Sequence, residues 1–120
     1  MNKGLTDSNE QVPQTFKDFI AKFPELGEAH EQAAKAVDRA GPLDDKTRFL
    51  IKMGICIGAG LESAFRSHVR RAIRAGATPE EFEQALLLAM NTVGFPRTVS
   101  AWQWAWQQIE RDRREEGGGS

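Results

Sequence analysis

Residues 61–76, LESAFRSHVRRAIRAG, have the most regular helical pattern in the chain. Their apolar side chains recur every three or four residues and charged side chains fall between them, which is the spacing of a helix with one face packed against a core. Gly76 supplies a C-terminal stop, so we predict a helix over this stretch. Its apolar stripe consists of Leu61, Ala64, Phe65, Val69, Ala72 and Ile73, and it includes one polar residue, His68.

Helical patterns continue on both sides of this stretch. Residues 49–60, FLIKMGICIGAG, are apolar on nearly every side, and a helix of that kind is buried on every side. In a chain this small, such burial implies that a partner chain covers part of the helix. Downstream, Thr78 to Glu81 form a capping box that begins a further helix, which Gly94 to Pro96 interrupt. We expect that helix to bury Phe82, Ala85, Leu86, Ala89, Met90 and Val93.

The remaining segments complete a helical bundle. Apolar spacing predicts helices over 16–23 and 26–40, which Pro24 and Gly41-Pro42 end. No segment shows the alternation of a strand, so we predict an all-α, single-domain bundle of about six helices. A last helix carries a stripe of Val99, Trp102, Trp106 and Ile109, with Trp104 off the stripe as a candidate for an exposed patch that meets another subunit.

The two ends of the chain lack this periodicity. Residues 1–12 are polar and are predicted to be a flexible arm. The helical domain is expected to occupy residues 13–114. Residues 115–120 end in GGGS, which is typical of a flexible tail or linker.

Composition and charge exclude several classes of protein. The 120 residues suit one domain, and 16 Lys+Arg against 17 Asp+Glu leave a net charge of −1, which argues against nucleic-acid binding. No apolar run reaches the roughly 18 residues of a membrane span, and the polar N-terminus is no signal peptide. One cysteine excludes an internal disulfide and a Cys-x-x-Cys pair. The sequence therefore predicts a soluble, cytoplasmic protein with no membrane partner.

His68 is the first candidate for chemistry, because it is the polar side chain in an apolar stripe. A buried imidazole either finds a hydrogen-bond partner or has its pKa lowered by desolvation. One interpretation is therefore a structural histidine bonded to a main-chain carbonyl. The other is a general acid or base with a pKa near neutral pH in a dry pocket. The pattern alone leaves both open.

The other reactive residue types give weaker signals. Cys56 lies in the apolar run, where burial raises the pKa of a thiol and makes it a small hydrophobe. The arginines around His68 form either a solvated face or, if one covers a pocket mouth, a bidentate grip on a carboxylate. His30 and His68 have no ligand spacing, so we predict no metal and no cofactor.

One segment of the amino-acid sequence resembles a known protein family. Residues 43–96 resemble the carboxymuconolactone decarboxylase family, which includes the alkylhydroperoxidase-D-like proteins. The matching features are the L-D-x-K-x-R opening from Leu43 to Arg48, the block from His68 to Glu81, and the G-x-P turn at Gly94. The resemblance implies an all-helical protomer that assembles as a homotrimer or homohexamer, with its active site near subunit contacts.

This chain departs from the family's redox-active members. The resemblance implies a C-x-x-C-x-x-x-H pattern in those members. Counting back from His68 puts the two cysteine positions at Leu61 and Ala64. The family's proton-relay glutamate falls at Phe49. A peroxide must be attacked by a thiolate, so that cycle loses both its thiols. The decarboxylase branch also lacks the cysteine pair, but the tyrosine typical of that branch is replaced by Thr92.

The resemblance and its departures together lead to a functional hypothesis. We expect a non-redox member, a lyase-like protein that performs proton transfer or decarboxylation on a small carboxylated or lactone-like metabolite. His68 would move the proton, and Arg70 or Arg71, with Arg48 as a further option, would hold a carboxylate. The apolar walls would come from Leu61, Phe65 and Met90.

Two alternatives belong to other classes. The first is a peroxiredoxin-like or alkylhydroperoxidase-like activity that uses Cys56 alone with an external thiol. The second is a non-catalytic oligomeric binding protein that keeps the fold after losing its chemistry. Accessibility of Cys56 would distinguish the first, and dependence of any rate on His68 would distinguish the second.

Overall fold

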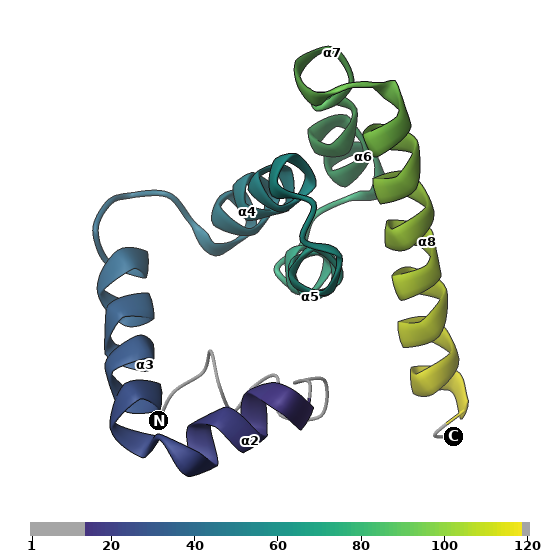
Figure 1. Ribbon diagram of the computed structural model, residues 1–120. Helices are drawn as coiled ribbons and strands as arrows, with labels where there is room; N and C mark the ends of the chain where they lie inside the picture. Colours follow the sequence, from purple (N-terminus) through teal and green to yellow (C-terminus); the bar gives the residue numbers. More distant parts are fainter. Residues whose placement is uncertain (1–13, 119–120) are drawn as a thin grey trace. The chain divides into compact units, whose positions relative to one another are not determined.

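The computed structural model describes residues 14–118, and the chain divides into two compact units at Pro42. Every regular element in the described residues is a helix, as Figure 1 shows, so the predicted all-α fold class is confirmed for that part of the chain. The predicted arm over residues 1–12 lies outside the described residues. None of the helices from residue 14 to residue 118 combines the length and apolar character needed to span a membrane.

The first unit is a pair of helices, α2 (Gln14–Lys22) and α3 (Pro24–Asp38). Pro24 takes the first position of α3, where its missing N–H costs nothing. The two helices meet where Ile20 lies on Gly27, and a Cβ at Gly27 would come within 2.8 Å of the Ile20 Cγ2 atom. Only glycine therefore permits this approach. Phe16 contacts His30 edge-on, with ring centroids 6.1 Å apart.

The second unit begins with α4 (Asp45–Ala59) and α5 (Glu62–Arg74). The Asp44 side chain caps α4 by accepting a hydrogen bond from the Thr47 N–H at 2.9 Å. Gly60 ends α4 in the left-handed conformation, with φ of 71°, which glycine adopts at little cost. The helices α4 and α5 pack against each other and carry half of the buried hydrophobic residues of the core.

Three further helices complete the second unit: α6 (Pro79–Leu87), α7 (Met90–Val93) and α8 (Phe95–Gly118). The predicted capping box is confirmed, because the Thr78 hydroxyl accepts from the Glu81 N–H and the Glu81 carboxylate accepts from the Thr78 N–H. The core of this unit is formed by residues of α4, α5, α6 and α8. Its fully buried large side chains are Met53, Ile57, Phe65, Val69, Phe82, Leu86 and Gln108.

Helix boundaries differ from the prediction at two places. The helix after the capping box ends at Leu87, and a separate α7 follows, so Met90 and Val93 lie 39% and 41% exposed rather than buried. Two turn residues separate α6 from α7, so the stripe of α6 does not continue into α7. The last helix runs to Gly118, whereas the sequence predicted a flexible tail from residue 115.

Burial differs from the prediction on α8, and on α4 the prediction stays open. Ile51 and Ile55 of α4 are 47% and 61% exposed in the single chain, so burial of this helix on every side stays a prediction that requires a partner chain. On α8 the buried line is Ala101 and Ala105, and the indoles lie along its edges. Trp104 packs on Phe65 with ring centroids 6.0 Å apart, so the more exposed indole is Trp102 (49%), not Trp104.

Candidate functional site

In the second unit, α4 and α5 bring aromatic and ionisable side chains together around His68. The His68 ring stacks on the Phe49 ring, with centroids 6.2 Å apart and planes inclined by 27°. The Lys52 Nζ atom lies 6.0 Å from the Phe49 centroid, at the limit of a cation–π contact. Phe49 and Lys52 share one side of α4 because they are three residues apart. The side chain of Phe49 therefore contacts both the imidazole and the ammonium group.

His68 is electrostatically unusual. It is half-buried, and burial is the main reason why its pKa falls from 6.5 to about 4, with the charges of Lys52 and Arg71 adding to the effect. Its Nδ1 atom is buried and has no hydrogen-bond partner among the described residues. The imidazole is therefore neutral at pH 7 and keeps one unsatisfied nitrogen.

Neither sequence-based interpretation of His68 describes this arrangement fully. The structural interpretation requires a hydrogen-bonded imidazole, and the buried Nδ1 atom has no partner among the described residues. The catalytic interpretation requires a pKa near neutral pH, whereas burial and two nearby cations lower the pKa to about 4. The catalytic interpretation is therefore wrong about the pKa of His68 in the free protein. A bound anion would offset the two cations and raise that pKa.

The predicted carboxylate-binding arginines lie in different places. Arg71 acts electrostatically on His68, so it belongs to this cluster. Arg70 is only 5% exposed, and its charge acts on Asp112 of α8. Arg48 donates hydrogen bonds to the Leu43 carbonyl and to the Asp45 carboxylate at the start of α4. Lys52, which the sequence analysis did not include as a site residue, is the second cation near the imidazole.

Arg70 belongs to a polar contact between α5 and α8. Gln108, 2% exposed, donates a hydrogen bond from its Nε2 atom to the Asp112 Oδ1 atom at 2.8 Å. Burial raises the pKa of the Asp112 carboxyl, and the nearby charges of Arg70 and Arg74 oppose that rise. The Gln108–Asp112 hydrogen bond lies within α8, so the link from Asp112 to α5 is the charge interaction with Arg70 and Arg74.

The predicted apolar walls do not share one cavity. Phe65 is fully buried in the core, where it contacts Trp104. Leu61 is 51% exposed at the residue before α5, and Met90 is exposed on α7. Sequence spacing could not place Met90, because the turn after Leu87 interrupts the helix on which that spacing relied.

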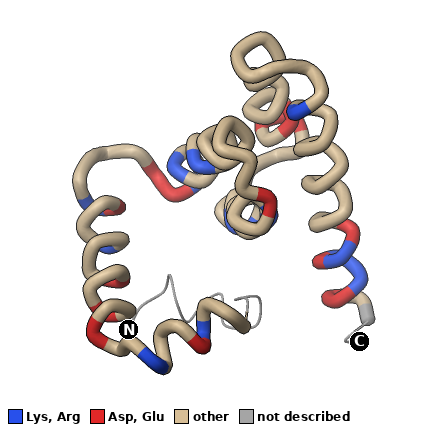
Figure 2. Tube along the Cα trace, in the orientation of Figure 1, with Lys and Arg blue, Asp and Glu red and all other residues tan. Residues whose placement is uncertain are grey.

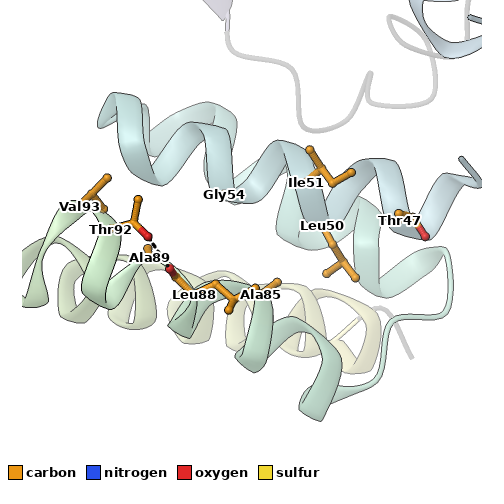
Figure 3. A pocket seen from close by; sticks show the side chains of 9 residues that line it. All are labelled: Thr47, Leu50, Ile51, Gly54, Ala85, Leu88, Ala89, Thr92 and Val93. Atoms are coloured by element: carbon orange, nitrogen blue, oxygen red, sulfur yellow. Dashed lines mark hydrogen bonds between the residues drawn. The ribbon is translucent and has the colours of Figure 1, made fainter. Parts of the chain in front are cut away.

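A hollow of about 350 Å³ lies instead between α4 and the α6–α7 segment, as Figure 3 shows. On α4 its lining residues fall at positions 47, 50, 51 and 54, which is one side of a helix, whereas Phe49 and Lys52 lie on the other side. The hollow and His68 are thus separated by α4. The lining residues are Thr47, Leu50, Ile51, Gly54, Ala85, Leu88, Ala89, Thr92 and Val93.

Cys56 and the acidic residues offer no further site. Cys56 is 5% exposed, and burial raises the pKa of its thiol more than the charge of Lys52 lowers it. The thiol is therefore protonated at neutral pH, which makes it a poor nucleophile. Between residues 14 and 118, no three His, Cys, Asp or Glu side chains come together in a way that could hold a metal ion.

Comparison with known proteins identifies relatives of this chain. An uncharacterised protein of Methanocaldococcus jannaschii is 28% identical over 93 residues, which are 77% of this chain and 87% of that protein. A Thermotoga maritima crystal structure matches with a TM-score of 0.66 and 23% identity, over 88% of this chain and 99% of its own.

A second Thermotoga maritima crystal structure gives a TM-score of 0.63 at 24% identity, over 98% of this chain and 90% of its own. It is described as a carboxymuconolactone decarboxylase family protein for which a role in the antioxidative response is suggested. At these identities the two structures establish the shared fold alone.

A sequence profile decides the family. The profile of the carboxymuconolactone decarboxylase family matches residues 24–107, which include parts of both units and most of the described helices. The resemblance found in residues 43–96 is thereby confirmed and extended in both directions. The chain belongs to the carboxymuconolactone decarboxylase family.

Proposed function

We propose that this chain acts by proton transfer on a small carboxylated or lactone-like metabolite, with His68 as the residue that moves the proton. One observation carries the proposal: a half-buried neutral imidazole has an unsatisfied Nδ1 atom and two cations near it. A neutral histidine can accept a proton, and a dry surrounding strengthens every polar contact that a substrate makes with it.

The two cations give this proposal its substrate class. A carboxylate bound near Lys52 and Arg71 would add negative charge beside the imidazole and raise the pKa of His68 above its value of about 4 in the free protein. The base would therefore become stronger when the substrate is bound. Lys52 and Arg71 are proposed because the charges of both act on His68, whereas the charge of Arg70 acts on Asp112 and Arg48 bonds to Asp45.

A decarboxylation at this site would begin with bond cleavage and end with proton transfer. The bond between the substrate carbon and its carboxylate breaks, CO2 leaves, and the electron pair remains on the carbon as an enolate stabilised by the lactone carbonyl. His68 takes a proton from water and donates it to that carbon, and the hydroxide left behind combines with the released CO2 as bicarbonate. Lys52 and Arg71 would hold a second carboxylate of the substrate and keep it in place.

The test uses two histidine variants. His68→Gln should lower CO2 release or deuterium exchange next to the carbonyl by about 10²–10⁴-fold across a panel of carboxylated γ-lactones. The control is His30→Gln, because His30 lies in the first unit against Phe16. Equal rates in wild type and His68→Gln, on a substrate that the wild type turns over, would contradict the proposal.

A peroxidase is the second candidate, favoured by the suggested antioxidative role of the Thermotoga maritima protein. In this chain it would have to use Cys56, whose thiol is buried and has a raised pKa. We therefore expect Cys56→Ser to consume cumene hydroperoxide, with dithiothreitol as reductant, no more slowly than the wild type. Loss of rapid peroxide turnover in Cys56→Ser would establish the peroxidase instead.

A binding protein without turnover would bind carboxylated lactones but show no rate that depends on His68.

A further inference from the structure

Phe49 is the side chain that lies beside both functional groups of the His68 cluster. Its ring stacks on the imidazole, with centroids 6.2 Å apart and planes inclined by 27°. The Lys52 Nζ atom lies 6.0 Å from the centroid of the same ring. Phe49 is partly buried and packs against the hydrophobic core, so the second unit itself fixes the position of its ring. The proposed base and the proposed cation therefore share one firmly packed aromatic neighbour.

The imidazole needs such a neighbour because no hydrogen bond orients it through its buried nitrogen. A histidine that moves protons is commonly held in one orientation by a hydrogen bond to the ring nitrogen that does not react. The buried nitrogen of His68 is Nδ1, and it has no hydrogen-bond partner among the described residues. Aromatic rings favour offset stacking at centroid distances of about 4.5–7 Å, and the ring of Phe49 is within that range. Packing against Phe49 therefore takes the place of the orienting hydrogen bond.

The ring of Phe49 also influences where a charge lies. The face of an aromatic ring is negative and attracts an ammonium group within about 6 Å. Phe49 and Lys52 are three residues apart, so they lie on one side of α4. Figure 2 shows basic residues on both α4 and α5, and they include Lys52 and Arg71, whose charges act on His68. A change at position 49 should therefore disturb both the plane of the imidazole and the place of the Lys52 ammonium.

We propose that Phe49 is a positioning residue of this site: its ring holds the imidazole of His68 in one plane and keeps the Lys52 ammonium beside it. Phe49 supplies no proton. It keeps the base and the cation for the substrate carboxylate in a fixed arrangement, which proton transfer within a bound complex requires. The kinetic consequence rests on the proposed function, whereas the contact with the imidazole can be tested without a substrate.

The first test measures the imidazole in the absence of substrate. Phe49→Leu keeps an apolar side chain but removes the flat face, so water should reach more of the imidazole and the pKa of His68 should rise by about one unit. Phe49→Tyr keeps the ring and should leave the titration of His68 unchanged. NMR titration of the imidazole carbon protons measures both, with His30 of the first unit as an internal reference. A titration of His68 that is the same in Phe49→Leu and wild type would overturn the proposal.

The matched control is Leu50→Ala on the same helix. Leu50 is also partly buried against the core, so this variant loses packing as Phe49→Leu does, but its side chain lines the hollow in Figure 3. We expect the titration of His68 in Leu50→Ala to match that of wild type, and urea unfolding compares the stability lost in the two variants. If Leu50→Ala moves the titration as far as Phe49→Leu does, the cause is a general loosening of the unit and Phe49 has no positioning role.

The second test uses a carboxylated γ-lactone that the wild type turns over. Phe49→Leu should lower kcat by about 10–100-fold and raise KM by less, because the base is misplaced while Arg71 still attracts the carboxylate. Phe49→Tyr should restore most of kcat, and Leu50→Ala should keep it near that of wild type. Equal kcat values in wild type and Phe49→Leu would overturn the positioning role, even where the loss of activity in His68→Gln upholds the proposed function. If the wild type turns over no lactone, the proposed function fails, and the titration of His68 decides whether Phe49 holds the imidazole.

Discussion

Both sides of α4 carry apolar residues, but the surroundings of the two sides differ. One side presents Phe49 and Lys52 to the imidazole of His68, where burial lowers the pKa of an ionisable group. The other side presents Leu50, Ile51 and Gly54 to a hollow whose lining residues carry no charge. Apolar periodicity thus indicates which residues avoid water. It does not indicate whether the chain's own core, a histidine or a second molecule covers them.

The largest expected effect separates the core side of α4 from its exposed side. Ile57 is fully buried and Ile55, two residues earlier, is 61% exposed. We expect Ile57→Ala to lower the free energy of unfolding by about 2–5 kcal/mol, through lost burial and the cavity left behind. Ile55→Ala should change it by less than about 0.5 kcal/mol in dilute protein. Urea unfolding followed by tryptophan fluorescence measures both.

The paired isoleucines also test the comparison itself. If a second copy of the chain covers Ile55, the loss of unfolding free energy in Ile55→Ala should grow as the protein concentration rises, because assembly adds to stability by mass action. The cost of Ile57→Ala should change little over the same range. An equal loss of unfolding free energy in Ile55→Ala and Ile57→Ala in dilute protein would mean that the two sides of α4 contribute equally to the stability of the single chain.

The next effect concerns acid pH and the His68 side. The folded-state pKa of about 4 lies below the ordinary 6.5, so the folded protein binds fewer protons than the unfolded chain between these values. Stability is therefore full above pH 6.5 and falls as the pH drops toward 4. The difference between these two pKa values corresponds to at most roughly 3.4 kcal/mol of stability, and partial exposure of the ring makes the contribution smaller.

The variant His68→Gln isolates this contribution, because glutamine does not titrate. The unfolding free energy of wild type minus that of His68→Gln should fall as the pH is lowered from 7 to 4. Lowered carboxyl pKa values at Asp44 and Glu81 also reduce stability in acid, but they act equally in both proteins. A difference that stays constant over this range would mean that His68 is not desolvated in the folded state.

Local signals in the sequence predicted much of the fold. The capping box at Thr78 and the N-cap at the start of α4 depend on neighbouring residues, so both could be predicted and both are present. The break between Leu87 and Met90 could not, because no glycine or proline marks it and the helical stripe continues through it in sequence.

The candidate site was less predictable than the fold, because it depends on contacts between helices. Periodicity identified His68 correctly as a polar residue in an apolar stripe. Which cation lies near it depends on the packing of α4 against α5, so Lys52 was missed and Arg70 was assigned to the wrong surroundings. The hollow was missed for the same reason, since the sequence shows Gly54 but not the empty space beside it.

The smallest expected effect tests the role of Lys52 beside His68. Removing its charge by Lys52→Met leaves burial and Arg71 in place, so the pKa of His68 should rise from about 4 toward 6.5 without reaching it, since burial is the larger cause. The NMR titration of the imidazole carbon protons measures this, and His30 supplies a second imidazole signal in the same spectrum. Lys46→Met is the matched control, because the Lys46 ammonium pairs with Glu81 at 3.1 Å. An unchanged His68 titration in Lys52→Met would remove Lys52 from the site while leaving the role of His68 itself open to the kinetic test.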